Sequence, residues 1–600
     1  MSTKKDFPES PSPALTQADL DEIGITNDNR EPTDEELKTL RRIPQKIPWN
    51  IYTIAFIELC ERFSYYGTTV VFTNFIQWPL PPGSTTGSDG GNGQAGALGL
   101  GQQTATALTT FNAFWQYMCP LFGAYVADSY LGRFKTISIS LGIGILAHII
   151  LIMSAIPPVI KNPDGAMGAF IIGIITLGGA TGGFKPNVNP LIAEQIDLEK
   201  MMVTTLPTGE RVIVDPHVTA SRVYHYFYLF INIGALMGQI SMVYAEYYVG
   251  FWLSYTLPTV MLCLCPFVML WGRKRYKRTP PQNSILGKSF KLLALACKGR
   301  WSINPVQTYK NMHDGTFWER VKPSKFANKP EWMDFNDAWV DEIARGFAAC
   351  TVFLWYPLFW LCYNQINNNL ISQAAVMRLG GVPNDVLSNL NPFSLLILVP
   401  LLDTFLYPTL RKWRINFTPI KRITMGYFVA ACAMIWACVL QYYIYKKSEC
   451  RTNASGYKDA EKTIRCEPVD ISVWAQTGSY VLIALSEVFG SITSLEYAQS
   501  KAPKSARSMV QAVCLFMNAI ASAIGFALVP LAEDPNLIWN YGVVAVMAAV
   551  GGSLFWLQFR SLDKMEDKLN MLPRGEIEGG EEQEEELVKE IGEKEKAIIS

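Results

Sequence analysis

Three charged residues stand close together inside an otherwise apolar segment of the chain. Glu58, Glu61 and Arg62 occur within the run ELCERFSYYG at i, i+3 and i+4, so a helix places them on one face. Two carboxylates that share one guanidinium form a proton site, because the arginine holds one ionised while burial and crowding favour a proton on the other. We therefore predict proton coupling at these residues. The alternative is an ion cluster that only fixes helix packing.

Two further charges lie in apolar segments. Lys185 directly precedes Pro186 in the run GGATGGFKPNVNPLIAEQ, and Glu487 follows a long apolar stretch with no base nearby in the sequence. An ionisable side chain inside a membrane is costly, so each is a functional candidate. For Lys185, a substrate or carboxylate partner competes with snorkelling to the membrane surface. Cations in the first half and Glu487 in the second predict a bipolar cavity that accepts a zwitterion.

Uncharged residues in the same segments are candidates for the wall of this cavity, although each could also serve helix packing. They are polar or aromatic: Tyr117, Asn232, Trp360, Asn364 and Asn391. The 4 histidines show no metal-ligand spacing, and no nucleotide-binding loop is present. We expect no metal, no cofactor and no enzymatic activity, so an ion gradient must supply the energy, and the carboxylate pair indicates the proton.

The composition indicates a membrane protein that could hold such charges. Charged residues make up 17% of the chain, against roughly a quarter in soluble domains, and 49% is hydrophobic. A spanning helix needs about 20 mostly apolar residues. Twelve segments qualify: 49–78, 104–126, 135–156, 166–193, 220–246, 250–272, 343–376, 389–410, 418–445, 472–498, 506–531 and 537–560. The net charge of +0 and the lack of a basic stripe argue against nucleic acid as a partner.

The distribution of basic residues predicts the sidedness of the chain. Short loops after the second, sixth, eighth and tenth segments are basic, which marks them as cytosolic. Both termini then lie in the cytosol, and residues 446–471 form an extracellular loop despite their lysines. Cys450 and Cys466 bracket this loop, which also contains the glycosylation pattern Asn453-Ala454-Ser455. A disulfide fits an oxidising exterior, and two free cysteines are the alternative.

The longest break between apolar segments divides the membrane part into two sets of six. We expect a first bundle over 49–272, a cytosolic loop over 273–342 and a second bundle over 343–560. The terminal segments 1–48 and 561–600 are expected to be solvated cytosolic arms. Within the loop, Ser284–Trp301 predicts an amphipathic helix that lies on the inner leaflet or packs between the halves. Its apolar face is predicted to contain Leu286, Phe290, Leu293 and Cys297.

These motifs resemble those of the proton-coupled oligopeptide transporters of the major facilitator superfamily. ELCERFSYYG matches the family pattern ExxERFxYYG at every fixed position, and GAYVADSYLGRFKT, GGFKPNVNPLIAEQ and FYLFINIGALMG are similar to other hallmarks, in order. The resemblance covers about residues 49–560 and is strongest to the fungal di- and tripeptide permeases. It implies an all-α fold of twelve transmembrane helices in two six-helix bundles, and symport of di- and tripeptides with protons at the plasma membrane.

The resemblance also implies roles for individual residues. Glu58, Glu61, Arg62 and Lys185 are implied in proton coupling, with Arg62 near the peptide carboxylate. Glu487 is implied to face the peptide amino terminus. The other matched pocket residues are Tyr65, Tyr66, Tyr117 and Asn232 in the first half, and Trp360 and Asn391 in the second.

Two positions depart from the family pattern. Many relatives have an acid where this chain has Asn364, and animal members have a histidine where it has Thr110. Proton coupling would then depend on Glu58, Glu61 and Glu487. Family members that carry nitrate or another small anion typically lack the intact ExxER, which argues against that alternative. A peptide sensor that does not transport is a further alternative, and the intact proton site argues against it. The oligomeric state and the side-chain preference stay open.

Overall fold

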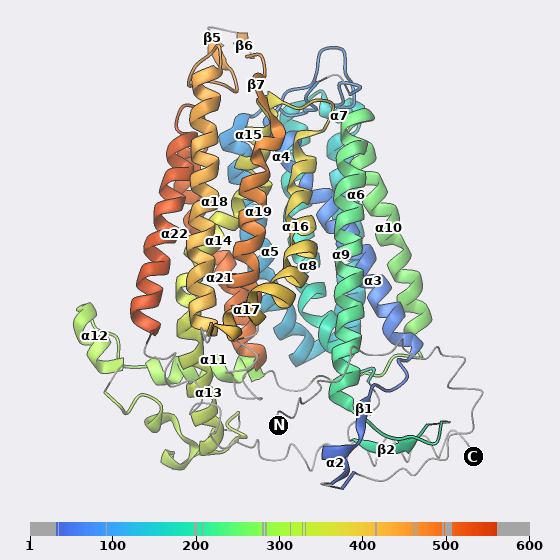
Figure 1. The fold of residues 1–600 in the computed structure, drawn as a ribbon, viewed down its shortest axis with the longest axis vertical. Helices are drawn as coiled ribbons and strands as arrows, with labels where there is room; N and C mark the ends of the chain where they lie inside the picture. The colour runs from blue at the N-terminus through green and yellow to red at the C-terminus, as the bar shows by residue number, and fades with distance from the viewer. Residues whose placement is uncertain are drawn as a thin grey trace, which may run out of the picture.

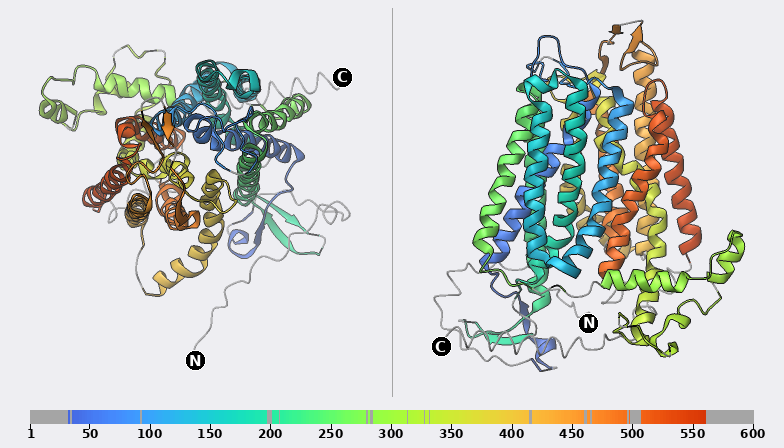
Figure 2. Two further views of the ribbon diagram at one scale, coloured as in Figure 1. Left: turned by 90° about the horizontal axis from the view of Figure 1, so that it is seen from above. Right: turned by 180° about the vertical axis from the view of Figure 1, so that it is seen from behind.

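The computed structural model describes residues 32–560, apart from 34, 92, 197–200, 207, 279–280, 282–284, 313, 327, 331, 414–416, 460–461, 465, 495–496 and 498–506. The C-terminal segment 561–600 and residues 1–31 lie outside the described residues. The described chain is mostly helical, with long helices side by side in two bundles (Figures 1 and 2). We call the end that carries the Cys450–Cys466 loop the disulfide end, and the opposite end, where α11 (Ile285–Cys297) lies, the α11 end.

The first bundle contains six spanning segments. Its helices are α3 (Trp49–Val70) continued by α4 (Phe72–Gln77), α5 (Gly101–Val126) continued by the π-helical turn η1 (Ala127–Leu131), α6 (Arg133–Ala155) followed by the short α7 (Pro157–Ile160), α8 (Pro163–Ala193), α9 (Pro216–Tyr248) and α10 (Phe251–Gly272).

The second bundle also contains six spanning segments, several of them broken. Its elements are α13 (Asp337–Cys350), η4 (Thr351–Trp355), α14 (Tyr356–Tyr363), η5 (Asn364–Asn367) and α15 (Asn369–Ala375) in the first segment; η6 (Asn384–Asn389), α16 (Leu390–Leu401), η7 (Leu402–Leu406) and α17 (Tyr407–Lys412) in the second; then α18 (Pro419–Lys447); η8 (Val473–Gln476), α19 (Thr477–Glu487) and η9 (Val488–Ile492); α21 (Arg507–Leu528) with η11 (Val529–Leu531); and α22 (Leu537–Phe559).

Among the described residues, 9 helical segments are long and apolar enough to cross a membrane. The others fall short for local reasons: α3 carries three charged residues, α5 is rich in Thr, Gln and Asn, and α19 ends after 11 residues at a π-helical turn. With these three, the described residues contain twelve spanning segments, as the sequence predicts.

The core of the first bundle is split into two apolar clusters. One, around Phe72, Phe170 and Tyr255, lies toward the disulfide end. The other, around Ile54 and Phe184, lies toward the α11 end. The buried charges of α3 stand between the two clusters, so apolar packing on either side fixes the height of a polar layer in the bundle.

Close helix contacts hold this polar layer in place. At Gly238 of α9, a side chain would overlap the backbone of Phe63 on α3, and at Gly182 of α8 it would overlap Cys119 on α5. Only glycine lets the backbones approach so closely, as is common at helix interfaces in membranes. The charged face of α3 and the lysine-bearing turn of α8 are thereby brought to the same interior.

The segment between the bundles packs on the second bundle. Leu292 and Ala296 of α11 are fully buried in the core cluster of that bundle. The structure therefore shows packing on the second bundle, whereas packing between the two halves was predicted, and a place on the inner leaflet stays a prediction. Of the predicted apolar face, Phe290 is wrong, because it is 42% exposed, and the fully buried residues are Leu292 and Ala296. Leu293 and Cys297 are half-buried, and the side chain of Leu286 lies outside the described residues.

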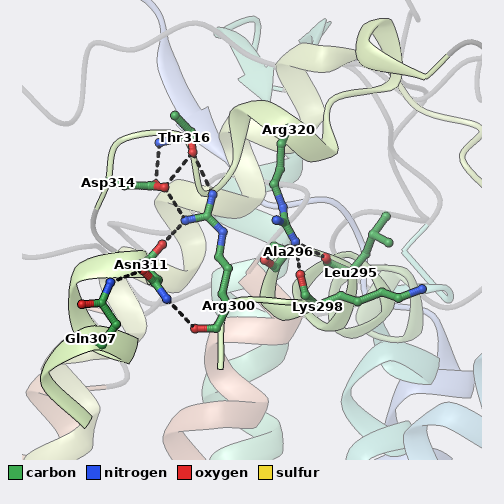
Figure 3. Close-up of polar contacts among 9 residues, drawn as sticks. All are labelled: Leu295, Ala296, Lys298, Arg300, Gln307, Asn311, Asp314, Thr316 and Arg320. Atoms are coloured by element: carbon green, nitrogen blue, oxygen red, sulfur yellow. Dashed lines mark hydrogen bonds and ion pairs between the residues drawn. The ribbon is translucent and has the colours of Figure 1, made fainter. Parts of the chain in front are cut away.

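Arginine side chains order the remainder of this segment (Figure 3). Arg300 is buried and its guanidinium donates to Asn311 O and, at 2.7 Å, to Thr316 Oγ1. It also pairs with Asp314 at 2.7 Å, and the hydrogen bond from Arg300 lowers the pKa of that carboxyl to about 2. Arg320 donates to the last carbonyls of α11, where a cation complements the helix dipole.

Part of the N-terminal arm is folded, a feature that the prediction of a solvated arm over 1–48 did not include. Strand β1 (Arg41–Ile43) pairs in parallel with β3 (Arg211–Val214), which pairs antiparallel with β2 (Met202–Thr205). Short α2 (Glu36–Thr39) precedes it. Arg41 bonds Glu210 and Arg42 bonds Asp215 at 3.1 Å, so opposite charges fix this small sheet below α9 at the α11 end (Figure 1).

A disulfide joins Cys450 and Cys466 at the end of α18. The loop it closes contains the hairpin of β5 (Tyr457–Asp459) and β6 (Lys462–Ile464), and β7 (Val469–Ser472) then pairs with β4 (Met377–Arg378). Asn453 is half-buried, and the Ser455 hydroxyl of its glycosylation pattern donates to Asp534 at 2.6 Å. Glycosylation of Asn453 stays a prediction.

We expect peptide mapping by mass spectrometry to recover Cys450 and Cys466 in one cross-linked fragment without reductant, and in two fragments with it. Replacing Cys450 by Ser removes a cross-link over 16 residues, which is worth about 3 kcal/mol in the unfolded chain, so the melting temperature should fall. Cys432→Ser, at an exposed free cysteine, is the control. Two free thiols in the non-reduced native protein would contradict the disulfide.

Candidate functional site

The three predicted charges of α3 form one buried cluster. Glu58, Glu61 and Arg62 are 3%, 7% and 4% exposed. Arg62 Nε donates to Glu58 Oε1 at 2.7 Å and lies 3.2 Å from Glu61 Oε2. Within the described part of the chain, Glu58 Oε2 and Glu61 Oε2 have no hydrogen-bond partner. Two carboxylates thus share one guanidinium and have spare acceptor capacity, so the cluster can take up a proton.

Lys185 of α8 faces this cluster from a second helix. Its Nζ lies 4.5 Å from the ring centre of Tyr117 on α5, a cation–π distance. Its charge interacts with those of Glu58, Glu61 and Arg62, and no described carboxylate forms an ion pair with it. Lys185 therefore points into the bundle rather than snorkelling outward, and its ammonium can meet another anion there.

Glu487 supplies negative charge from the opposite bundle. It is the last residue of α19, directly before the π-helical turn η9. Its Oε2 accepts a hydrogen bond from Asn391 Nδ2 of α16 at 3.1 Å. Asn391 is buried, whereas Glu487 is half-buried. The amide thus orients the carboxylate and leaves it access to the interior space.

Tyrosines lie between the two charged groups. Tyr66 and Tyr117 of the first bundle are within electrostatic reach of both Arg62 and Glu487. Tyr228 of α9 and Tyr363 of α14 are within reach of Glu487 and were missed from the sequence. For Tyr228 the sequence did hold a signal, since it lies within the motif FYLFINIGALMG and precedes Asn232 by four residues. Arg62 and Glu487 therefore face the same tyrosine-lined space.

The other predicted residues take different places around it. Asn232 donates to Tyr228 O of its own helix at 2.7 Å, so its amide is already engaged. The ring of Trp360 meets those of Phe359 and Tyr363 edge-on, with centres 5.4 and 5.3 Å apart. Tyr65 lies against Tyr66 and borders, with Glu61, a small cavity inside the first bundle.

Asn364 lies nearer the disulfide end than the charged groups. Its amide donates to Asn518 Oδ1 at 3.2 Å. It lines a polar cavity between the bundles, together with Thr110, Asn368 and Asn369. Both positions that depart from the family pattern, Asn364 and Thr110, therefore border one cavity, and both are uncharged here.

Polar side chains close the space between the bundles at the disulfide end. Asn74 and Asn384 exchange two hydrogen bonds of 2.9 Å between their amides. The other described inter-bundle hydrogen bonds join Thr73 to Asn367 O, Gln77 to Ser372, Gln94 to Asn384, and Gln102 and Thr106 to Asn369. We call these residues the seal. Because the described inter-bundle bonds gather at one end, the structure is closed there.

The chain is similar to a family of known proteins. Residues 134–544 match the model of the POT family. The chain is 38% identical over 561 residues to "Peptide transporter PTR_A" of Candidozyma auris, covering 93% of this chain and 89% of that one. It is 40% identical over 547 residues to "Probable peptide transporter ptr2" of Schizosaccharomyces pombe, covering 90% and 82%.

Solved structures agree in fold. The crystal structure of the POT family transporter PepTSo superposes with a TM-score of 0.65 at 19% identity, over 87% of this chain and 99% of that one. An auto-inhibited POT family peptide transporter also gives 0.65, at 20% identity, over 86% and 97%. The predicted all-α fold of two six-helix bundles is confirmed. With the family match over most of its length, the chain belongs to the POT family.

Proposed function

We propose that the protein is a proton-coupled symporter that imports di- and tripeptides across the plasma membrane. The observation that carries this proposal is the placement of Arg62 and Glu487, from opposite bundles, around one tyrosine-lined space. A short peptide is a zwitterion whose ends need opposite partners once it leaves water. Curated relatives that match this chain over most of its length are named peptide transporters.

In this proposal, the disulfide end faces the exterior and the α11 end the cytosol. The basic loops GRKRYKR after α10 and the Arg411–Lys412 pair after η7 lie on the α11 side, as the positive-inside rule requires. A disulfide at the opposite end suits an oxidising exterior. The closed seal then corresponds to a state whose site is shut off from the outside.

The site would hold both ends of the peptide. Its carboxylate would approach Arg62 and Lys185, and its ammonium would approach Glu487. Tyr66 and Tyr117 would form the wall between them. Because the two ends bind different bundles, the bound peptide favours closure of the bundles around itself, and alternating access follows as rocking of one bundle against the other.

The proton gradient would drive uptake, with no bound cofactor. The Arg62 cluster binds a proton from the acidic side and releases it on the other, while Lys185 exchanges partners between the cluster and the peptide carboxylate. Glu487 argues against the anion-transport alternative, because a small anion brings no positive group that could pair with this carboxylate. A sensor without transport would show binding but no accumulation.

Uptake into proteoliposomes tests the proposal. We expect labelled dipeptide to accumulate when the exterior is acidic, to equilibrate when the pH is equal on both sides, and not to accumulate when an ionophore collapses the gradient. Nitrate serves as the competing substrate in a parallel measurement. Accumulation of nitrate but not dipeptide would contradict the proposal, and saturable binding without accumulation would favour the sensor.

A further inference from the structure

Two acidic residues outside the peptide site meet where the bundles touch at the disulfide end. Glu246 belongs to α9 of the first bundle and Asp385 to η6 of the second. They are 2% and 1% exposed, and their carboxyl groups lie within hydrogen-bonding reach of each other. Neither has a role in the transport cycle described above.

The hydrogen bonds of this pair lack one donor. Glu246 Oε1 accepts from Asn74 Nδ2 at 2.9 Å. Glu246 Oε2 and both carboxylate oxygens of Asp385 have no partner among the described residues, although the backbone amides of Asp385 and Val386 lie nearby. Two ionised carboxylates offer only acceptors. A bond between them therefore requires one proton.

The surroundings offer no positive charge that could replace this proton. The groups that face the pair in the described structure are uncharged: Asn74 and Asn384 beside it, Tyr255 of α10 near Glu246 and Tyr480 of α19 near Asp385. Both tyrosine hydroxyls are buried without a described partner. Two negative charges in such a low-dielectric site repel each other strongly.

The acidic pair also belongs to the contact between the bundles at the disulfide end, which must open in the proposed transport cycle. Asn74, which donates to Glu246, exchanges two hydrogen bonds with Asn384, the neighbour of Asp385. Opening the disulfide end would break this amide pair and separate the two carboxyls, so that each meets water and ionises. Closing brings them together again.

We propose that Glu246 and Asp385 form a second proton-binding site, which takes up one shared proton as the disulfide end closes. The proton supplies the missing hydrogen bond and removes the repulsion between the carboxylates. The inference extends the proposed function, since it assumes that the bundles alternate, but its test measures conformation and not uptake. A failure of transport and a failure of this site are therefore distinguishable.

Because closure and proton binding are linked, the direction of the pH dependence of closure can be stated. Above about pH 4.5, both separated carboxyls are ionised, whereas the closed pair holds one proton. The closed state then binds one proton more than the open state at this site, so the ratio of closed to open molecules falls up to tenfold for each pH unit gained. Protons bound at the Arg62 cluster also contribute to the pH dependence of the ratio of closed to open molecules. The informative quantity is therefore the difference in this pH dependence between the wild type and a variant of the acidic pair.

The distance between the bundles at the disulfide end measures this ratio. Spin labels on genetically encoded amino acids at Thr85 and Glu533, exposed loop residues of opposite bundles, avoid the native cysteines. The full chain in lipid nanodiscs is measured from pH 5 to pH 8.5. We expect the short-distance population to decrease as the pH rises.

Glu246→Gln and Asp385→Asn are the decisive variants. Each places an amide donor opposite the remaining carboxylate and so replaces the shared proton. We expect each to lower the number of protons linked to closure by one and to raise the closed population at pH 8.5. Thr39→Ser, a change in α2 at the α11 end, should leave the pH dependence of the ratio of closed to open molecules unchanged. If either carboxyl variant kept the pH dependence of the wild type, the proposal of a shared proton would be wrong.

Discussion

Glu61→Gln is expected to abolish uphill uptake of dipeptide while peptide exchange at equal pH persists. Glu58 is held by the 2.7 Å hydrogen bond from Arg62 Nε, whereas Glu61 Oε2 has only the 3.2 Å ion pair with the same atom. Glu61 is therefore the carboxylate that can give up its charge more easily. Glutamine keeps the shape but cannot titrate. Exchange needs no net proton movement, so it should survive better than accumulation.

The expected effect is large. For each co-transported proton, a gradient of one pH unit supports about tenfold accumulation, and the variant should reach no more than equal concentrations inside and outside. Glu58→Gln should also lose accumulation, because Arg62 would then pair with Glu61 alone. Glu533→Gln, an exposed glutamate, is the matched control. If a variant still accumulated dipeptide in a pH-dependent way and to the level of the control, the mutated glutamate would have no role in proton coupling.

The charged core of the site could be predicted because its signal is local. Glu58, Glu61 and Arg62 lie within five consecutive residues, and helical periodicity alone brings them together. Charges within an apolar span are also rare enough to be conspicuous, which applies equally to Lys185 and Glu487. The structure gathers these five around one space.

The seal and the acidic pair could not be predicted because their partners are distant in the sequence. Asn74 and Asn384 are uncharged amides near the ends of their spans, where polar residues are common, and only the packing of the bundles makes them partners. Strand β1 was missed for a similar reason. Its three residues pair with a segment about 170 positions away, and RRI within a polar arm has no strand periodicity.

The hydropathy of the sequence also did not predict the local irregularities in the helices. The π-helical turn η9 follows Glu487 directly, and the 3-10 turn η5 begins at Asn364. Such irregularities are frequent at functional sites, where they change the direction of neighbouring side chains. Hydropathy reports the mean polarity of a span and carries no information on the backbone path within it.

Glu487→Gln is expected to weaken binding of dipeptides with a free amino terminus by about 2 kcal/mol, or about 30-fold. Arg62 and Lys185 belong to the first bundle and Glu487 to the second, so a bound peptide has its ammonium beside this carboxylate. The amide of the variant can still accept the 3.1 Å hydrogen bond from Asn391, so the local structure is kept. What is lost is the negative charge that compensates a buried ammonium.

N-acetylated dipeptides separate this effect from a general loss of binding. They lack the ammonium and bind the wild-type site weakly, so the variant should change their affinity much less. Competition uptake with matched free and acetylated dipeptides measures both affinities on one protein, with Glu533→Gln as the control. An equal loss for both peptides would mean that Glu487 does not face the amino terminus. The ammonium would then need another acid, and in the described interior of the second bundle the next candidate is Asp385, which is adjacent in the chain to Asn384 of the seal.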